Sequence, residues 1–152
     1  MAAPATSIPM LTERQRDIIR AARSWIGTPY QHQASAKGAG TDCLGLIRGV
    51  WREVVGREAM PPPPYTPDWA RRAGRETLLL AAQACLKPMQ TTEAGQVLAF
   101  RLRPDWPVTH IGLLTDRGLL HAYAGRGVIE HPFVPFWRRR HTHSFSFPEI
   151  AP

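Results

Sequence analysis

Cysteine is scarce in this chain, whose 152 residues include only Cys43 and Cys85. Two cysteines allow one disulfide at most, which excludes a small domain held together by a disulfide framework. The CxxC and HExxH patterns of common zinc sites are also missing from the sequence. We therefore expect neither a cofactor nor a resident metal ion.

Long apolar runs are absent as well. No segment approaches the roughly 18 consecutive apolar residues of a membrane-spanning helix, so no transmembrane segment is expected. Residues 1–16 contain neither the basic start nor the apolar stretch of a secretory signal. If the protein acts outside the cytoplasm in which it is made, something other than a signal peptide is expected to carry it.

Acidic residues are outnumbered, because 12 Asp and Glu accompany 19 Lys and Arg, for a formal net charge of +7. This charge favours anionic surroundings such as nucleic acid, a membrane surface or an anionic cell envelope. The basic residues are dispersed, however, and only Arg138–Arg140 form a run. No nucleic-acid-binding motif is present, so we expect no direct nucleic-acid readout.

The length fits one domain with a single core, and we expect it to span 1–152. Residues 1–11 are predicted to form an extended leader. The sequence PPPPYTPDW (61–69) cannot continue a helix or a central strand, and it is too short to mark a domain boundary.

Helical patterns occupy the first part of the chain. The sequence TERQ (12–15) predicts a capping box and a helix to about Ile26. A second helix begins at TDC (41–43) and ends near Gly56, and a third spans roughly 69–86.

Strand patterns follow the helices. Five short strands are predicted at 96–100, 109–115, 119–124, 128–131 and 141–147, with DRG and GRG as hairpin turns among them. Helices followed by an antiparallel meander predict an α+β fold rather than an alternating βαβ fold.

The sequence GTDCLGL (40–46) places Cys43 in the first turn of the second helix, with Thr41 or Asp42 as N-cap. Such a cysteine can be a small core residue, half of a disulfide, a metal ligand or a nucleophile. Unpaired N–H groups and the helix dipole favour negative charge there, so this placement is expected to lower the thiol pKa.

Two histidines favour the interpretation of Cys43 as a nucleophile. His110 and His121 lie on strands joined by the DRG turn, so pairing around this turn brings them close together. One ring can then act as a base while the other orients it. Alternatively, each is an ordinary strand residue, or both join Cys43 and Asp42 in a zinc site.

Four ordered blocks carry a family resemblance: GTPY (27–30), TDCLGL (41–46), THIGLL (109–114) and LLHA (119–122). They resemble the signature of the NlpC-type cell-wall peptidases, which are papain-like cysteine peptidases acting on peptidoglycan stem peptides. The resemblance covers roughly residues 12–131 and implies a papain-like fold.

Matched by motif, the resemblance implies that Cys43 is the nucleophile, His110 the general base and His121 the orienting residue. It also implies that the Tyr30 hydroxyl helps to stabilise the oxyanion. Asp42 is expected to hold the helix start or to contact the substrate amine. The resemblance suggests cleavage of the bond between D-glutamate and diaminopimelate.

Residues 32–53 and 65–70 resemble a narrower group, the phage-type cell-wall peptidases encoded among tail genes, including those of gene transfer agents. This resemblance implies a virion component at the tail tip, with tail hub or baseplate proteins as partners. Residues 132–152 fall outside the family core and are expected to be available for docking. The alternatives are a free lysis enzyme of the same chemistry and a tail structural protein with a vestigial peptidase fold.

The chain departs from the family pattern at two positions. Leu44 replaces the usual serine after the cysteine, and Gln96 replaces the usual aspartate that enters the first central strand. These changes are expected to affect the wall of the substrate cleft and the local turn, respectively.

Overall fold

The computed structural model describes residues 10–58 and 76–149. Its helices are α1 (Glu13–Arg23), α2 (Cys43–Val54), α4 (Thr77–Cys85) and α5 (Pro135–Arg138). Its strands are β1 (Ser35–Ala36), β2 (Gly40–Thr41), β3 (Lys87–Met89), β4 (Val97–Phe100), β5 (His110–Leu114), β6 (Leu119–Tyr123), β7 (Gly127–His131) and β8 (His141–Ser146). The stretch 61–69, most of the expected leader and the expected start of the third helix lie outside the described residues.

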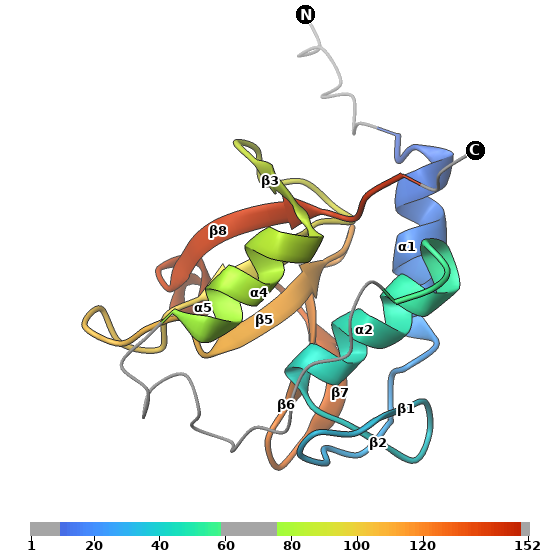
Figure 1. The fold of residues 1–152 in the computed structure, drawn as a ribbon, viewed down its shortest axis with the longest axis horizontal. Coiled ribbons are helices and arrows are strands. Elements are labelled where there is room, and N and C mark those ends of the chain that lie inside the picture. Colours follow the sequence, from blue (N-terminus) through green and yellow to red (C-terminus); the bar gives the residue numbers. More distant parts are fainter. Residues whose placement is uncertain (1–9, 59–75, 150–152) are drawn as a thin grey trace, which may run out of the picture.

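Six antiparallel strands form the main sheet in the order β3-β8-β4-β5-β6-β7 (Figure 1). The five expected strands all form, each within one residue of its predicted ends, and the α+β class is confirmed. The segment 132–152 supplies β8, which lies between β3 and β4 inside the sheet. This segment is therefore part of the fold, and its use in docking stays a prediction.

The capping box at the start of α1 forms as predicted. The Thr12 hydroxyl accepts the backbone N–H of Gln15, and the Gln15 side chain accepts the backbone N–H of Thr12. The helix ends at Arg23, with Ser24 as C-cap, instead of continuing to Ile26 as predicted. Because Gly27 has a φ of 91°, which favours glycine, the chain turns away there.

The two faces of the sheet belong to different apolar clusters. The larger core fills the space between one face and the helices α1, α2 and α4, and it includes Ile111 of β5. On the opposite face, Leu98, Phe100 and Leu119 pack with Trp137 of α5. This second cluster was not predicted, and it covers the sheet face on which His110 and His121 lie.

A close contact between α1 and α2 fixes the direction of the helix that carries Cys43. A Cβ added at Gly49 of α2 would overlap the ring of Trp25, which directly follows the C-cap of α1. The glycine therefore lets the two helices lie side by side (Figure 1).

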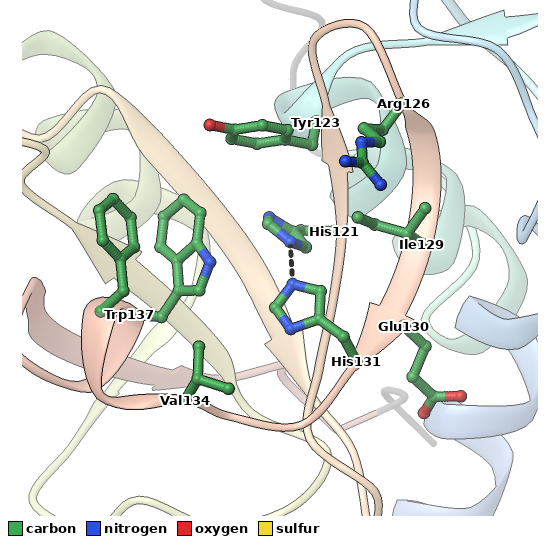
Figure 2. Close-up of a pocket in the computed structure, with 9 residues that line it drawn as sticks. His121, Tyr123, Arg126, Ile129, Glu130, His131, Val134 and Trp137 are labelled. Atoms are coloured by element: carbon green, nitrogen blue, oxygen red, sulfur yellow. Dashed lines mark hydrogen bonds between the residues drawn. The ribbon is translucent and has the colours of Figure 1, made fainter.

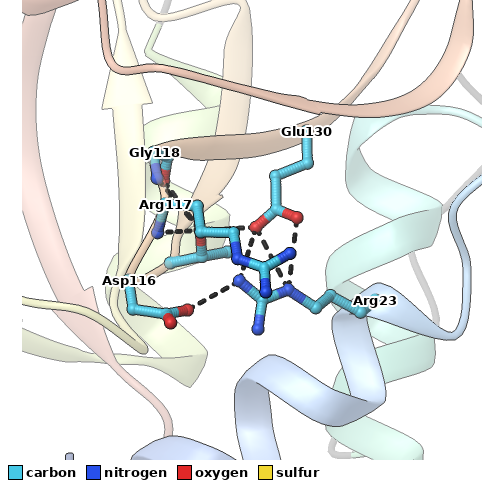
Figure 3. Close-up of polar contacts among 6 residues, drawn as sticks. Arg23, Asp116, Arg117, Gly118 and Glu130 are labelled. Atoms are coloured by element: carbon cyan, nitrogen blue, oxygen red, sulfur yellow. Dashed lines mark hydrogen bonds and ion pairs between the residues drawn. The ribbon is translucent and has the colours of Figure 1, made fainter.

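An ion-pair network joins α1 to the far edge of the sheet (Figure 3). Arg23 pairs with Glu130 of β7 at 2.9 Å and with Asp116 in the β5–β6 turn at 2.6 Å. Thr115 also donates its hydroxyl to Glu130 at 2.6 Å. Burial alone would raise the pKa of Glu130, but the hydrogen bonds from Arg23 and Thr115 outweigh it and hold the pKa below its usual value.

We expect Arg23→Gln to lower the free energy of unfolding at neutral pH by about 1–3 kcal/mol, because Glu130 loses its charged partner. The depressed pKa values of Glu130 and Asp116 stabilise the fold above the carboxyl pKa values of the unfolded chain, and this stabilisation is lost as the pH falls through the folded values. Urea unfolding of both proteins from pH 7 to pH 3 should show the difference shrinking. A constant difference would contradict an ionic origin.

Candidate active site

The start of α2 is held by Asp42, which is only 3% exposed. Its Oδ1 accepts the backbone N–H of Gly45 at 2.7 Å, and its Oδ2 accepts the N–H of Gln33 at 2.8 Å. Asp42 is therefore the N-cap, and it also ties the loop before the helix to the helix start. The structure shows the first of the two roles expected for Asp42; contact with a substrate amine stays a prediction.

Cys43 is the first residue of α2, and its sulfur lies against the start of β5. The backbone N–H groups of Ile111, Leu44 and Cys43 itself are near enough to the sulfur to favour its negative form. Because Ile111 directly follows His110, this contact places the thiol beside the residue next to the predicted base. Neither Cys43 nor Cys85 forms a disulfide.

The expected low pKa of Cys43 is not found. Burial raises the pKa of the Cys43 thiol to about 12, the negative charge of Asp42 adds to this rise, and the three backbone donors only partly oppose it. The lowering effect of the helix start on the thiol pKa is therefore outweighed by the removal of the sulfur from solvent. At neutral pH the resting residue is a thiol, which needs a base at the moment of attack.

His110 and His121 are brought together as predicted. His110 Nε2 and His121 Nδ1 lie 2.7 Å apart, within hydrogen-bonding distance. The strand register pairs Leu113 with Leu120, which places Gly112 opposite His121. A Cβ at Gly112 would come within 3.1 Å of the His121 Cβ and 2.9 Å of a Leu119 methyl. The missing side chain thus leaves room for the His121 ring to reach His110.

We expect Gly112→Ala to displace His121, and any activity that depends on the His110–His121 pair should fall by roughly 10-fold or more, because a misplacement of about 1 Å is costly for reacting groups. The new methyl crowds side chains of β6, so a loss of about 1–3 kcal/mol in stability should accompany it. Activity and thermal unfolding measured on one preparation test this. Unchanged activity would mean that His121 tolerates the shift.

Both histidines are held in their neutral form. Burial lowers the pKa of His110 to about 4. Burial also lowers the pKa of His121 to about 2, and the neighbouring His110 and His131 rings disfavour its charged form further. Because a neutral imidazole has one basic nitrogen, His110 is in the protonation state that can accept a proton at pH 7.

The sequence did not reveal a partner for His131, but the structure supplies one. His121 Nε2 lies 2.8 Å from His131 Nε2, and His131 Nδ1 lies 2.8 Å from the carbonyl oxygen of Pro132. Figure 2 shows the His121 and His131 rings joined in this way. A hollow of about 700 Å³, lined partly by Tyr123 and Trp137, opens beside them.

Trp137 covers the pair of predicted catalytic histidines. Its ring centroid lies 5.1 Å from that of His110 and 5.0 Å from that of His121, and the residue is 6% exposed. This contact was not predicted from the sequence. No local sequence pattern could show this contact, because it depends on how a helix of only four residues packs on the face of the sheet.

The remaining predicted site residue, Tyr30, also lies at the start of α2. It forms a parallel bridge with Thr41, and burial raises the pKa of its hydroxyl to about 12, with smaller contributions from the charges of Cys43 and Asp42. The hydroxyl is therefore protonated at neutral pH and can donate a hydrogen bond near the thiol.

Gln96, at the position where the sequence departs from the family pattern, holds the turn before β4. Its carboxamide oxygen accepts the backbone N–H of Glu93 at 2.9 Å, and its nitrogen donates to the Thr91 hydroxyl at 2.9 Å. The turn before β4 is thus closed without a carboxylate. Leu44 packs against the main core.

Within residues 10–58 and 76–149, no three His, Cys, Asp or Glu side chains are arranged to hold a metal ion. The imidazoles of His110, His121 and His131 are instead hydrogen-bonded to one another. In the same part of the chain, no helix has the length and apolar character needed to cross a membrane.

Cys43 thus stands at the start of α2, near Ile111 of the strand β5 that begins with His110, and His110 is paired with His121 on the antiparallel sheet. No family model matches the sequence, and no curated protein matches it significantly. Solved structures do match, and they show that the chain has the NlpC/p60 fold.

One similar structure is the NlpC/p60 domain of the peptidoglycan hydrolase SagA, with a TM-score of 0.57 and 22% identity over 88% of this chain and 98% of that one. An NlpC/p60 family protein from Bacillus cereus gives a TM-score of 0.59 with 17% identity, over 92% of this chain and 41% of that one. A lipoprotein-like NLP/P60 family protein from Staphylococcus aureus gives a TM-score of 0.57 with 17% identity, over 99% of this chain and 46% of that one. The chain thus spans less than half the length of the last two.

Proposed function

We propose that this protein is a cysteine peptidase that hydrolyses an amide bond in the stem peptides of peptidoglycan. The observation that carries the proposal is the hydrogen bond between His110 and His121, with Cys43 at the start of α2 near Ile111, the residue that follows His110. The similarity to the hydrolase domain of SagA supports the choice of peptidoglycan as substrate class.

In the proposed reaction, His110 takes the proton of Cys43 as the sulfur attacks the substrate carbonyl. The negative oxygen that forms accepts hydrogen bonds from the backbone N–H groups at the start of α2 and from the Tyr30 hydroxyl. His110 then gives its proton to the leaving amine, and water hydrolyses the acyl-enzyme. His121 orients His110 throughout, through the hydrogen bond between their rings.

We further propose that the bond cleaved is the one between D-glutamate and diaminopimelate. This choice rests on the resemblance of the four sequence blocks. Purified protein should be incubated with peptidoglycan, and the released muropeptides should be identified by mass spectrometry. New amino-terminal diaminopimelate supports this bond, and a different new terminus would replace it. Intact peptidoglycan would contradict the proposed activity.

We also propose that the protein is a component of a phage or gene-transfer-agent tail, where it opens the wall locally so that DNA can pass. The resemblance of residues 32–53 to tail-encoded peptidases supports this role, and the net charge of +7 suits an anionic envelope. Mass spectrometry and zymography of purified particles provide the test. Particles that lack the protein, while it accumulates free in lysing cells, would make it a lysis enzyme instead. Its presence in particles that show no activity would favour a structural role.

A further inference from the structure

The hydrogen bonds of His110 do not end at His121. Three imidazoles on β5, β6 and β7 form one line, with nitrogen–nitrogen distances of 2.7 Å and 2.8 Å, and the line ends at the Pro132 carbonyl 2.8 Å from His131. We propose that His131 is a positioning residue that fixes the tautomers of His121 and His110, so that His110 presents a bare Nδ1 to the thiol. This inference rests on the proposed peptidase function.

The direction of donation along these hydrogen bonds is set at the outer end, where His131 meets the Pro132 carbonyl. A carbonyl oxygen only accepts, so His131 carries a proton on Nδ1, and in this tautomer its Nε2 accepts. His121 therefore donates from Nε2 and carries no proton on Nδ1. His110 in turn donates from Nε2, which leaves Nδ1 as its basic nitrogen.

The same direction suits the charge that develops during the reaction. When His110 takes the thiol proton, it becomes an imidazolium with an N–H on both nitrogens. Its Nε2–H then points at the lone pair of His121 Nδ1, which stabilises the charge. If His121 carried its proton on Nδ1, two N–H groups would oppose each other and the imidazolium would be disfavoured.

Contacts of the backbone around His131 hold the His131 side chain in place. A Cβ at Gly118 would overlap the carbonyl oxygen of His131, so the β5–β6 turn packs directly on the His131 backbone. The neighbouring Glu130 is held by Arg23 and Thr115. Two independent contacts thus fix the position of His131, the outer end of the hydrogen-bonded relay of His110, His121 and His131.

The first test measures the tautomers without any substrate. Long-range proton–nitrogen NMR of the ¹⁵N-labelled wild-type protein at pH 7 should show the proton on Nδ1 of His131 and on Nε2 of both His121 and His110. Any other pattern at His121 or His110 would overturn the relay, even if the protein hydrolyses peptidoglycan. Correct tautomers in a protein that does not hydrolyse peptidoglycan would contradict the proposed function while the relay stands.

The second test measures hydrolysis. His131→Leu removes the acceptor for His121 and should lower kcat/KM by about 10- to 100-fold, because a small misplacement of a reacting group costs up to about 100-fold. His131→Gln should recover most of this loss, because its carboxamide oxygen can accept from His121 and its NH₂ can donate to Pro132. His143→Leu is the matched control, since this β8 histidine hydrogen-bonds to Thr142 instead, and it should keep wild-type activity.

A double-mutant cycle separates positioning from a general loss of structure. If His131 acts through His121, then His131→Leu should have little further effect in a His121→Ala background. Full additivity of the two losses, or equal losses in His131→Gln and His131→Leu, would overturn the proposal.

Discussion

Cys43→Ala is expected to lower kcat/KM for stem-peptide hydrolysis by roughly 10⁴-fold or more, since removing the nucleophile leaves only binding and oxyanion stabilisation. Thermal unfolding should change little, because the substitution replaces one small side chain by another and leaves the Asp42 cap intact. The rate of muropeptide release from purified peptidoglycan is the measurement.

Cys85→Ala is the matched control, because Cys85 is the other free thiol and lies at the end of α4. It should retain wild-type activity. A chelator should also leave the rate unchanged, and loss of activity that zinc restores would indicate a metal site. If Cys43→Ala keeps the wild-type rate, the nucleophile assignment is wrong.

The sequence predicted those parts of the site that depend on local pattern. The cap at Asp42 placed Cys43 in the first helical turn, and the short DRG turn set a register that joins His110 to His121. Both inferences need only a few neighbouring residues. The strand limits were predictable for the same reason, since strict alternation and hairpin turns are local signals.

The parts that were missed depend on contacts between distant segments. Trp137 contacts His110 and His121 from α5, which lies in the connection between the edge strand β7 and β8 beside β4. His131 becomes part of the site through its ring hydrogen bond to His121 and through a backbone carbonyl, which has no sequence signal.

The pKa of Cys43 was predicted in the wrong direction for a related reason. Helix position is visible in the sequence, whereas the burial that raises the pKa to about 12 depends on the packing of α2 against the sheet. The site therefore starts from a neutral thiol and a neutral imidazole. Thiolate formation then depends on His110, and His110→Ala should slow the reaction of Cys43 with iodoacetamide.

The pH profile of kcat/KM should distinguish this buried pair from an exposed one. His110 acts as a base only when neutral, so activity is present above its folded pKa and lost as the pH falls through it. With that pKa lowered to about 4, the acid limb should lie well below the usual value near 6.5. Stability must be followed in parallel, because the depressed histidine pKa values destabilise the fold as the pH falls from about 6.5 towards 4. An acid limb near 6.5 in folded protein would contradict the burial argument.

His110→Ala should lose as much activity as Cys43→Ala, roughly 10⁴-fold, because the thiol then has no base and the leaving amine has no acid. His121→Ala should retain a larger residual rate, since His121 orients the base without touching the substrate. Kinetics of both variants on one defined muropeptide, with circular dichroism to verify folding, provide the comparison. Equal losses in the two variants would give His121 a direct part in the chemistry, and wild-type rates in His121→Ala would remove it from the site.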